Sequence, residues 1–121
     1  MKSYTDLEQS KKLAEILPIE SADMWWNVDF TNYPSIEENI GFYQESKADI
    51  PCWSLAPLRS SLPCGVNINN TLHVFESHNT FDGDWVYVYK FENSEPLYTK
   101  ASNEIDACYE MIVKLHEQKL L

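Results

Sequence analysis

The C-terminal stretch, residues 103–121, constrains the fold most, because it specifies one amphipathic helix. Asn103 is a favoured N-cap residue, and Asp106 can reach back to the cap as in a capping box. The apolar residues recur at spacings of three and four and form one stripe: Ile105, Cys108, Met111, Ile112 and Leu115. The sequence therefore predicts a helix whose stripe is buried against another element, with Cys108 as an unreactive thiol.

The period of the apolar residues changes to two after Gly65, which is typical of strands. Strands are predicted over 66–68, 71–77, 84–91 and 97–100, and Asn69-Asn70 suits the left-handed turn of a tight hairpin. Strand 84–91 is apolar on both faces, which indicates a central strand. One face carries the aromatic ladder Trp85, Tyr87, Tyr89 and Phe91.

Two further helices are predicted before the sheet. Thr5-Asp6-Leu7-Glu8 has the pattern of a capping box and opens a helix that runs to Leu17, where Pro18 stops it. A short helix over 53–62 has a distorted start, because Pro57 would lie in its second turn. Residues 19–50 give the weakest signal, and we expect loop or short turns from Asn32 to Ala48.

Together these elements predict an α+β fold in a single domain over 1–121. A small antiparallel sheet of three to four strands, about 66–100, packs against the N-terminal helix, the short middle helix and the C-terminal helix.

The chain is acidic, with a formal net charge of −10. Residues 1–50 hold ten Asp or Glu against four Lys. Such a field repels nucleic acid and anionic membranes, so direct binding to either is disfavoured. A solvated acidic surface is the simplest interpretation, and an acidic face for a basic partner, or one that imitates DNA phosphates, is the sharper one.

Cellular location is inferred from what the sequence lacks. It contains no apolar run of the roughly 20 residues that a membrane span needs, and its start does not have the pattern of a signal peptide. Three cysteines, an odd number, favour reduced thiols over a disulfide framework. We therefore expect a cytoplasmic protein.

The candidate interaction residues are aromatic or lie beside aromatic residues. Trp25 and Trp26 are adjacent and follow Asp23, and neighbours on a strand cannot both point inward. We expect one tryptophan to be buried and the other half-buried, which leaves a surface for a partner. Tyr87 is a fourth candidate, because its aromatic ladder either forms core or provides a stacking platform for a ligand.

No metal or catalytic motif stands out. The candidate ligands Cys52, Cys64, His73, His78 and Cys108 lack the close pairing of structural zinc sites, so neither a metal nor another cofactor is expected. Cys, His and acidic residues occur without a recognisable local catalytic motif. Glu37-Glu38 and the pair Asp82 and Asp84 are interpreted as solvated turn residues. The sequence therefore favours a protein that is not an enzyme.

Three stretches of the chain resemble a family of small uncharacterised proteins encoded in prophages and mobile elements of gut bacteria. The stretches are 4–18 with 20–24, which includes Thr5-Asp6-Leu7-Glu8; Pro51-Cys52-Trp53-Ser54-Leu55 with Leu62-Pro63; and Ile105-Asp106-Ala107-Cys108-Tyr109-Glu110-Met111-Ile112. The family has no established activity, so the resemblance implies a genomic setting and no mechanism.

The leading hypothesis is a non-catalytic, acidic accessory protein of a phage or mobile element that contacts a host or phage protein. The alternative is a small-molecule-binding protein or an enzyme with a pocket beside the 85–91 aromatic ladder. A weaker alternative is a DNA-mimicking anti-defence protein.

Overall fold

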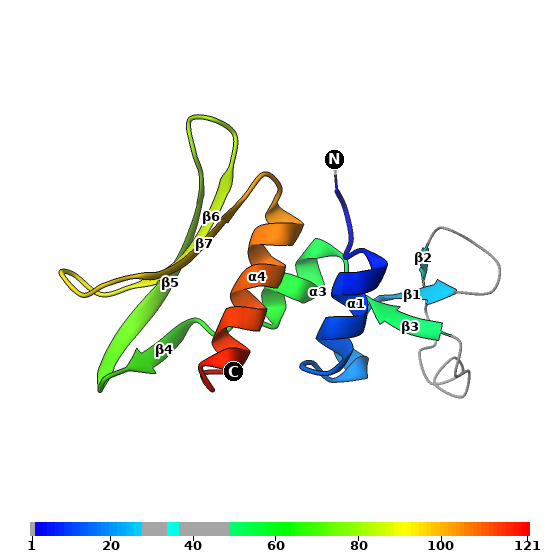
Figure 1. Cartoon of the computed structure of the whole chain (residues 1–121), viewed down its shortest axis with the longest axis horizontal. Helices are drawn as coiled ribbons and strands as arrows, with labels where there is room; N and C mark the ends of the chain where they lie inside the picture. Colours follow the sequence, from blue (N-terminus) through cyan, green and yellow to red (C-terminus); the bar gives the residue numbers. More distant parts are fainter. Residues whose placement is uncertain (1, 28–33, 37–48) are drawn as a thin grey trace. The chain divides into compact units, whose positions relative to one another are not determined.

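The computed structural model describes residues 2–27, 34–36 and 49–121 (Figure 1). They form two compact units: an N-terminal unit within 3–61, and a C-terminal unit of 62–121 together with Lys2. Helices and antiparallel sheets occur in separate parts of the chain, so the predicted α+β class is confirmed. The single domain over 1–121 stays a prediction.

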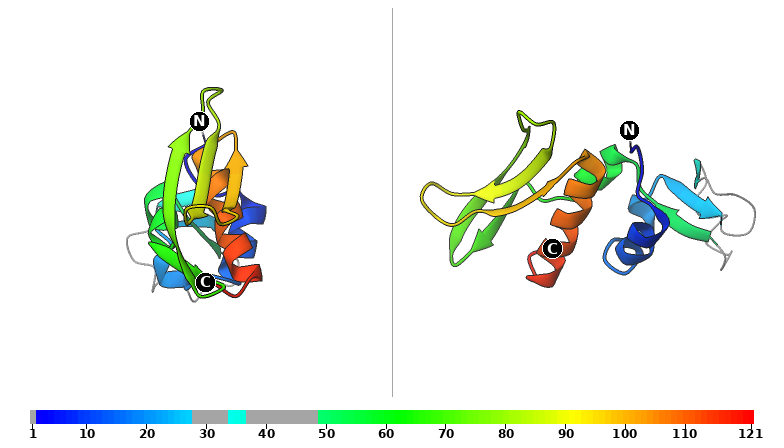
Figure 2. Two further views of the ribbon diagram at one scale, coloured as in Figure 1. Left: turned by 90° about the vertical axis from the view of Figure 1, so that its left-hand side faces the viewer. Right: turned by 45° about the horizontal axis from the view of Figure 1, so that its top comes forward.

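The C-terminal unit is built on a four-stranded antiparallel meander (Figure 2). Its strands, in spatial order, are β4 (Gly65–Ile68), β5 (Thr71–Asn79), β6 (Trp85–Lys90) and β7 (Leu97–Ala101). All four predicted strands are present, and β6 is central as expected. Asn69 and Asn70 join β4 to β5 with φ of 52° and 64°, the left-handed backbone that a two-residue hairpin turn requires.

Helix α4 (Glu104–Glu117) lies across one face of this sheet (Figure 1). The Asn103 side chain accepts a hydrogen bond from the Asp106 amide at 2.8 Å, which confirms the predicted N-cap. The Asp106 carboxylate accepts from the Asn103 side-chain amide at 2.8 Å and pairs with Lys2 at 2.7 Å. The entire predicted apolar stripe is buried, Cys108 included.

Aromatic side chains of β6 form the core beneath α4. Tyr87 and Tyr89 are fully buried, and the Phe75 ring lies 5.3 Å and 5.2 Å from their ring centres. Both hydroxyl groups are satisfied: Tyr87 donates to Glu104 at 2.5 Å and Tyr89 to the Pro63 carbonyl at 2.7 Å.

The N-terminal unit contains a second antiparallel sheet. It comprises β1 (Met24–Asn27), β2 (Pro34–Ile36) and β3 (Asp49–Cys52), in the order β2-β1-β3. Helix α1 (Leu7–Ala14) packs against β3, the 3-10 helix η1 (Ile19–Ser21) precedes β1, and α3 (Leu55–Ser60) follows β3. Tyr4 and Ser54 also form an isolated antiparallel β-bridge in this unit.

The expectation of loop and short turns from Asn32 to Ala48 is therefore wrong where β2 forms, and β1 lies in the preceding stretch, for which no element was predicted. Residues 28–33 and 37–48 lie outside the described residues. Strands of three or four residues are too short to show alternation. Pro34 and Pro51 also count against a strand, and both are tolerated here because β2 and β3 are the edge strands.

Both helices of the N-terminal unit differ from their predicted bounds. The N-cap of α1 is Asp6, which forms the capping box with Gln9, and α1 ends at Ala14 rather than Leu17. Helix α3 begins at Leu55 after Ser54, so Pro57 is its third residue. An amide in the first turn has no helical partner, so proline is accommodated there and no distorted start is needed.

No helix in the described ranges is long and apolar enough to cross a membrane.

Replacing Tyr89 by Phe tests the core of the C-terminal unit. Loss of the hydrogen bond to Pro63 should cost about 1 kcal/mol of unfolding free energy near pH 8. Burial, with smaller contributions from Cys108 and Cys64, raises the pKa of Tyr89 above its ordinary value. The stability that depends on the neutral phenol is therefore present below about pH 10 and lost as pH rises further.

The measurement is urea unfolding of wild type and Tyr89→Phe at pH 8 and at pH 11. The stability gap between them should narrow at pH 11, since only the wild type loses this contribution. A gap that stays constant or widens would contradict the buried, neutral phenol.

Candidate functional site

Asp23 is a structural residue in the described unit. Its carboxylate accepts hydrogen bonds from the Ser54 amide, at 2.9 Å, and from the Ser54 hydroxyl. Because Ser54 is the N-cap of α3, Asp23 fastens the start of this helix to the end of η1 and the start of β1. These hydrogen bonds give Asp23 a role within the fold that does not require binding to another protein.

The adjacent tryptophans divide as expected, one buried and one half-buried. Trp25 is only 3% exposed, and its indole nitrogen has no hydrogen-bond partner among the described residues. The Trp26 indole donates to the Thr5 carbonyl at 3.2 Å, and its ring meets Tyr4 edge-on at 6.0 Å. Trp25 therefore belongs to the core, and the polar end of Trp26 is already engaged.

Tyr87 offers no surface to a ligand or partner. Its side chain is fully buried beneath α4, and its hydroxyl donates to Glu104. Of the predicted aromatic ladder, Tyr87 and Tyr89 form core, while Phe91 lies beyond β6 against His73. Tyr87 and Tyr89 therefore offer no exposed ring on which a ligand could stack.

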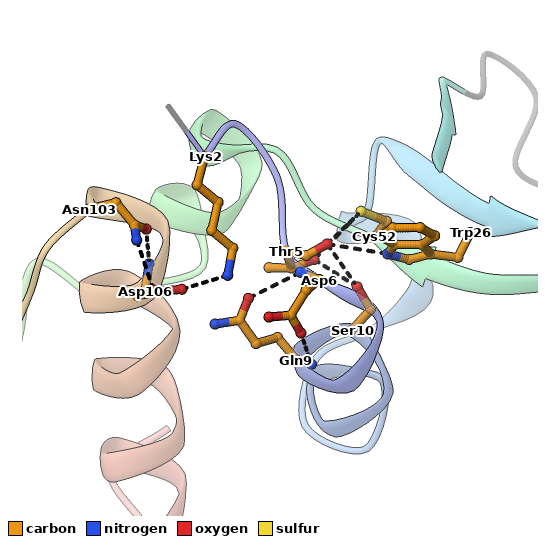
Figure 3. Close-up of polar contacts among 9 residues, drawn as sticks. All are labelled: Lys2, Thr5, Asp6, Gln9, Ser10, Trp26, Cys52, Asn103 and Asp106. Atoms are coloured by element: carbon orange, nitrogen blue, oxygen red, sulfur yellow. Dashed lines mark hydrogen bonds and ion pairs between the residues drawn. The ribbon is translucent and has the colours of Figure 1, made fainter. Parts of the chain in front are cut away.

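Thr5 organises a buried polar cluster in the N-terminal unit (Figure 3). Its hydroxyl is 2.8 Å from the Ser10 hydroxyl and accepts from the Trp53 amide at 3.2 Å. Its carbonyl accepts from the Cys52 thiol at 3.3 Å as well as from Trp26. The Thr5 backbone amide also donates to the Trp53 carbonyl at 3.0 Å. One residue therefore links the start of α1, the end of β3 and the indole of β1.

The three thiols differ in access. Cys52 and Cys108 are fully buried, whereas Cys64 is exposed. Burial raises the pKa of Cys52 above its ordinary value, against weaker lowering by its hydrogen bonds to Thr5 and Ser10. Cys52 is therefore a protonated structural thiol and is poorly placed to act as a nucleophile.

The candidate metal ligands do not gather. Within the described part of the chain, no three His, Cys, Asp or Glu side chains form a group that could hold a metal ion. The His73 Nδ1 atom lies 3.0 Å from the Thr71 carbonyl oxygen, which occupies that ring nitrogen.

Open clefts lie beside the edge strand β7 of the C-terminal unit. One of about 550 Å³ lies between β7 and α4, and a second of about 470 Å³ reaches from β7 to the turn between β4 and β5. Tyr98 and Lys114 line both clefts, and the Lys114 ammonium donates to the Tyr98 carbonyl at 2.9 Å. Tyr87 lines neither cleft, and nothing in their walls forms a catalytic arrangement.

The sheet face turned away from α4 is the stronger candidate for a functional surface. Alternation places Leu72 and Val74 of β5 on this face, because their neighbours His73 and Phe75 point toward the core. Val88 of β6 lies on the same face, because it pairs with Glu76, two positions from Val74. Its partner on β7 is Tyr98, whose ring lies at the edge of the sheet, 5.8 Å from the Lys114 ammonium of α4. Four apolar side chains thus follow a diagonal line across three strands: Leu72, Val74, Val88 and Tyr98. We call it the apolar diagonal.

The apolar diagonal is open to solvent. Leu72, Val74 and Tyr98 are 54%, 51% and 54% exposed, and Val88 is buried between its neighbours. The Glu76–Lys90 ion pair, at 2.8 Å, lies on the same face and crosses the diagonal, because Glu76 pairs with Val88 and Lys90 with Val74. An open sheet face normally carries polar side chains, so this row is an exception.

The apolar residues of this face are visible in the sequence of β5, but their pattern does not show that the face is open to solvent. Leu72 and Val74 alternate with His73 and Phe75, which indicates apolar character on both sides of β5. Apolar character on both sides suggests a strand covered on both faces, and α4 covers only one.

The acidic-face hypothesis falls partly outside the described residues, because Asp29, Glu37, Glu38 and Glu45 are among the residues not described.

Comparison with protein-family models, with curated proteins and with solved structures finds no match to this chain.

Replacing Thr5 by Val tests the buried cluster. Valine has the same shape but cannot accept from the Trp53 amide or bond the Ser10 hydroxyl, so unfolding free energy should fall by about 1–3 kcal/mol. Urea unfolding followed by tryptophan fluorescence in a Trp85→Phe background reports only the N-terminal unit.

The control for Thr5→Val is Thr5→Ser, which keeps the hydroxyl and should lose less stability. Equal midpoints for Thr5→Val and wild type would show that the cluster does not stabilise this unit.

Thiol labelling tests the different access of the cysteines. Ellman's reagent should react quickly with Cys64 in the native protein and with Cys52 and Cys108 only after unfolding, because both are buried. Cys64→Ser should abolish the fast reaction. A second fast thiol in native Cys64→Ser would contradict the described burial.

Proposed function

We propose that this protein is a non-catalytic, acidic accessory protein of a phage or mobile element that acts in the cytoplasm by binding another protein. The observation that carries the proposal is the apolar diagonal on the open face of the four-stranded sheet. The resemblance to prophage proteins of gut bacteria supplies the setting, and a host or phage protein is the partner.

Burial of the apolar diagonal would supply binding free energy. Fully burying a Leu or Val side chain contributes about 1.5–3 kcal/mol, and Leu72 and Val74 have roughly half of that still to gain. Tyr98 adds an aromatic ring, a side chain enriched at protein interfaces. These apolar side chains share the face with the Glu76–Lys90 pair, so the surface combines apolar and charged contacts, as protein interfaces do.

The net charge of −10 favours a basic partner, because opposite charges speed association and suppress wrong encounters. The same charge disfavours nucleic acid. The pocket alternative depended on a stacking platform at Tyr87 and Tyr89, and both side chains are fully buried. Protein binding is therefore the better-supported class.

The double variant Leu72→Ser/Val74→Ser tests the proposal. Both side chains point away from the core, so the fold should persist, and circular dichroism checks this. Wild type immobilised on a support should retain a protein from a gut-bacterial host lysate, and mass spectrometry identifies it. The purified partner should then bind the double variant about tenfold or more weakly in a direct titration.

Leu121→Ser is the matched control, because Leu121 is 42% exposed and lies outside the sheet. It should bind like wild type. Equal affinity of the double variant and wild type would refute this surface, and light scattering that shows a dimer dissolved by the double variant would identify a second copy of the chain instead.

A further inference from the structure

The β5–β6 hairpin presents a fully exposed phenylalanine at its tip. Phe81 lies in the connection between β5 and β6, and the structure leaves its side chain in solvent. In Figures 1 and 2 this connection extends beyond the first turn of α4 in the same unit. The remaining residues of the tip are Thr80, Asp82, Gly83 and Asp84.

The tip has an ordered backbone. Thr80 donates to the Asp84 carbonyl at 2.7 Å, and Gly83 donates to the Thr80 carbonyl at 2.9 Å. The Asp84 amide donates to the Thr80 hydroxyl at 3.1 Å. Gly83 has a φ of 90°, a conformation that glycine adopts without strain. Phe81 is therefore held in place by a turn that is already formed, and little backbone entropy is lost when it binds.

Phe81 contributes nothing to the packing of its own unit. A fully exposed ring buries no apolar area, so any polar residue would serve the turn equally well. An aromatic ring on a preformed turn is instead the kind of side chain that anchors protein interfaces by filling a pocket.

The charges beside Phe81 specify the rim of that pocket. Asp82 is exposed, and the Asp84 carboxylate lies 3.7 Å from the Lys100 ammonium. Two carboxylates that directly follow an apolar ring match an apolar pocket bordered by Lys or Arg, and they oppose an anionic lipid surface.

We propose that Phe81 is an anchor that inserts into an apolar, Lys- or Arg-rimmed pocket of the partner protein. The inference rests on the proposed function for the existence of that partner. It adds a second contact just beyond the far end of β5: Leu72 and Asn79, the last residue of this strand, are seven positions apart, about 23 Å of extended strand.

Photo-crosslinking locates the contact. Full-length chain with p-benzoylphenylalanine at position 81 is irradiated in a gut-bacterial host, and the same probe at Asn93, in the exposed β6–β7 connection, is the control. A crosslink specific to position 81, on a peptide with apolar and basic residues, supports the proposal. Equal crosslinking from both positions overturns it.

Titration of the purified crosslinked protein then measures the anchor. Phe81→Ala should weaken binding by about tenfold or more, Phe81→Leu should weaken it less, and thermal midpoints should equal that of wild type. Asp82→Lys should slow association and reduce its dependence on salt. Unchanged affinity of Phe81→Ala overturns the proposal.

The two surfaces fail separately. If Leu72→Ser/Val74→Ser weakens binding and Phe81→Ala does not, the anchor is refuted and the proposed function stands. If only Phe81→Ala weakens binding, the anchor stands and the apolar diagonal is refuted. Phe81-dependent sedimentation with phosphatidylcholine vesicles, or a Phe81-dependent dimer in light scattering, overturns the protein partner in favour of a lipid surface or a second copy.

Discussion

Burial of the apolar stripe of α4 against one face of the meander is the constraint on which the C-terminal unit depends. A four-stranded sheet has two faces, and one helix covers only one of them. On the covered face, Tyr87, Tyr89 and Phe75 fill the space below the helix, and each tyrosine hydroxyl has a partner. No helix of this unit covers the opposite face, so the apolar side chains on that face are exposed to solvent.

The N-terminal unit depends on a different kind of interaction. Its sheet has short strands with a proline in each edge strand, so ladder hydrogen bonds alone are few. Thr5 compensates by engaging α1, β1 and the residues after β3 through both its backbone and its hydroxyl. Asp23 has a similar role at Ser54. Residues that look available for function in the sequence are used here to hold short elements together.

The parts of the fold that could be predicted are those with a repeated local pattern. The stripe of α4, the alternation of β5 and β6 and the Asn69-Asn70 turn each repeat or use a residue type with one conformational preference. The small sheet could not be predicted, because its pairing joins segments far apart in sequence and Pro51 argues against a strand. Of the candidate site, the division of the tryptophan pair into one buried and one half-buried side chain was predicted, but not which is which. The burial of Tyr87 depends on α4, and local pattern cannot specify which face a helix covers.

The Lys114 ammonium protects part of the edge strand β7 from pairing with another chain. A bare edge strand offers its carbonyl groups to any other extended chain, and an apolar sheet makes such pairing more hazardous. In this unit, Lys114 reaches from α4 to occupy the Tyr98 carbonyl on β7, with its charge 5.8 Å from the centre of the Tyr98 ring. A chain that adds to this edge must first displace a cation. Growth into a continuous intermolecular sheet is therefore opposed at the β7 edge, even though the face beside it exposes apolar side chains.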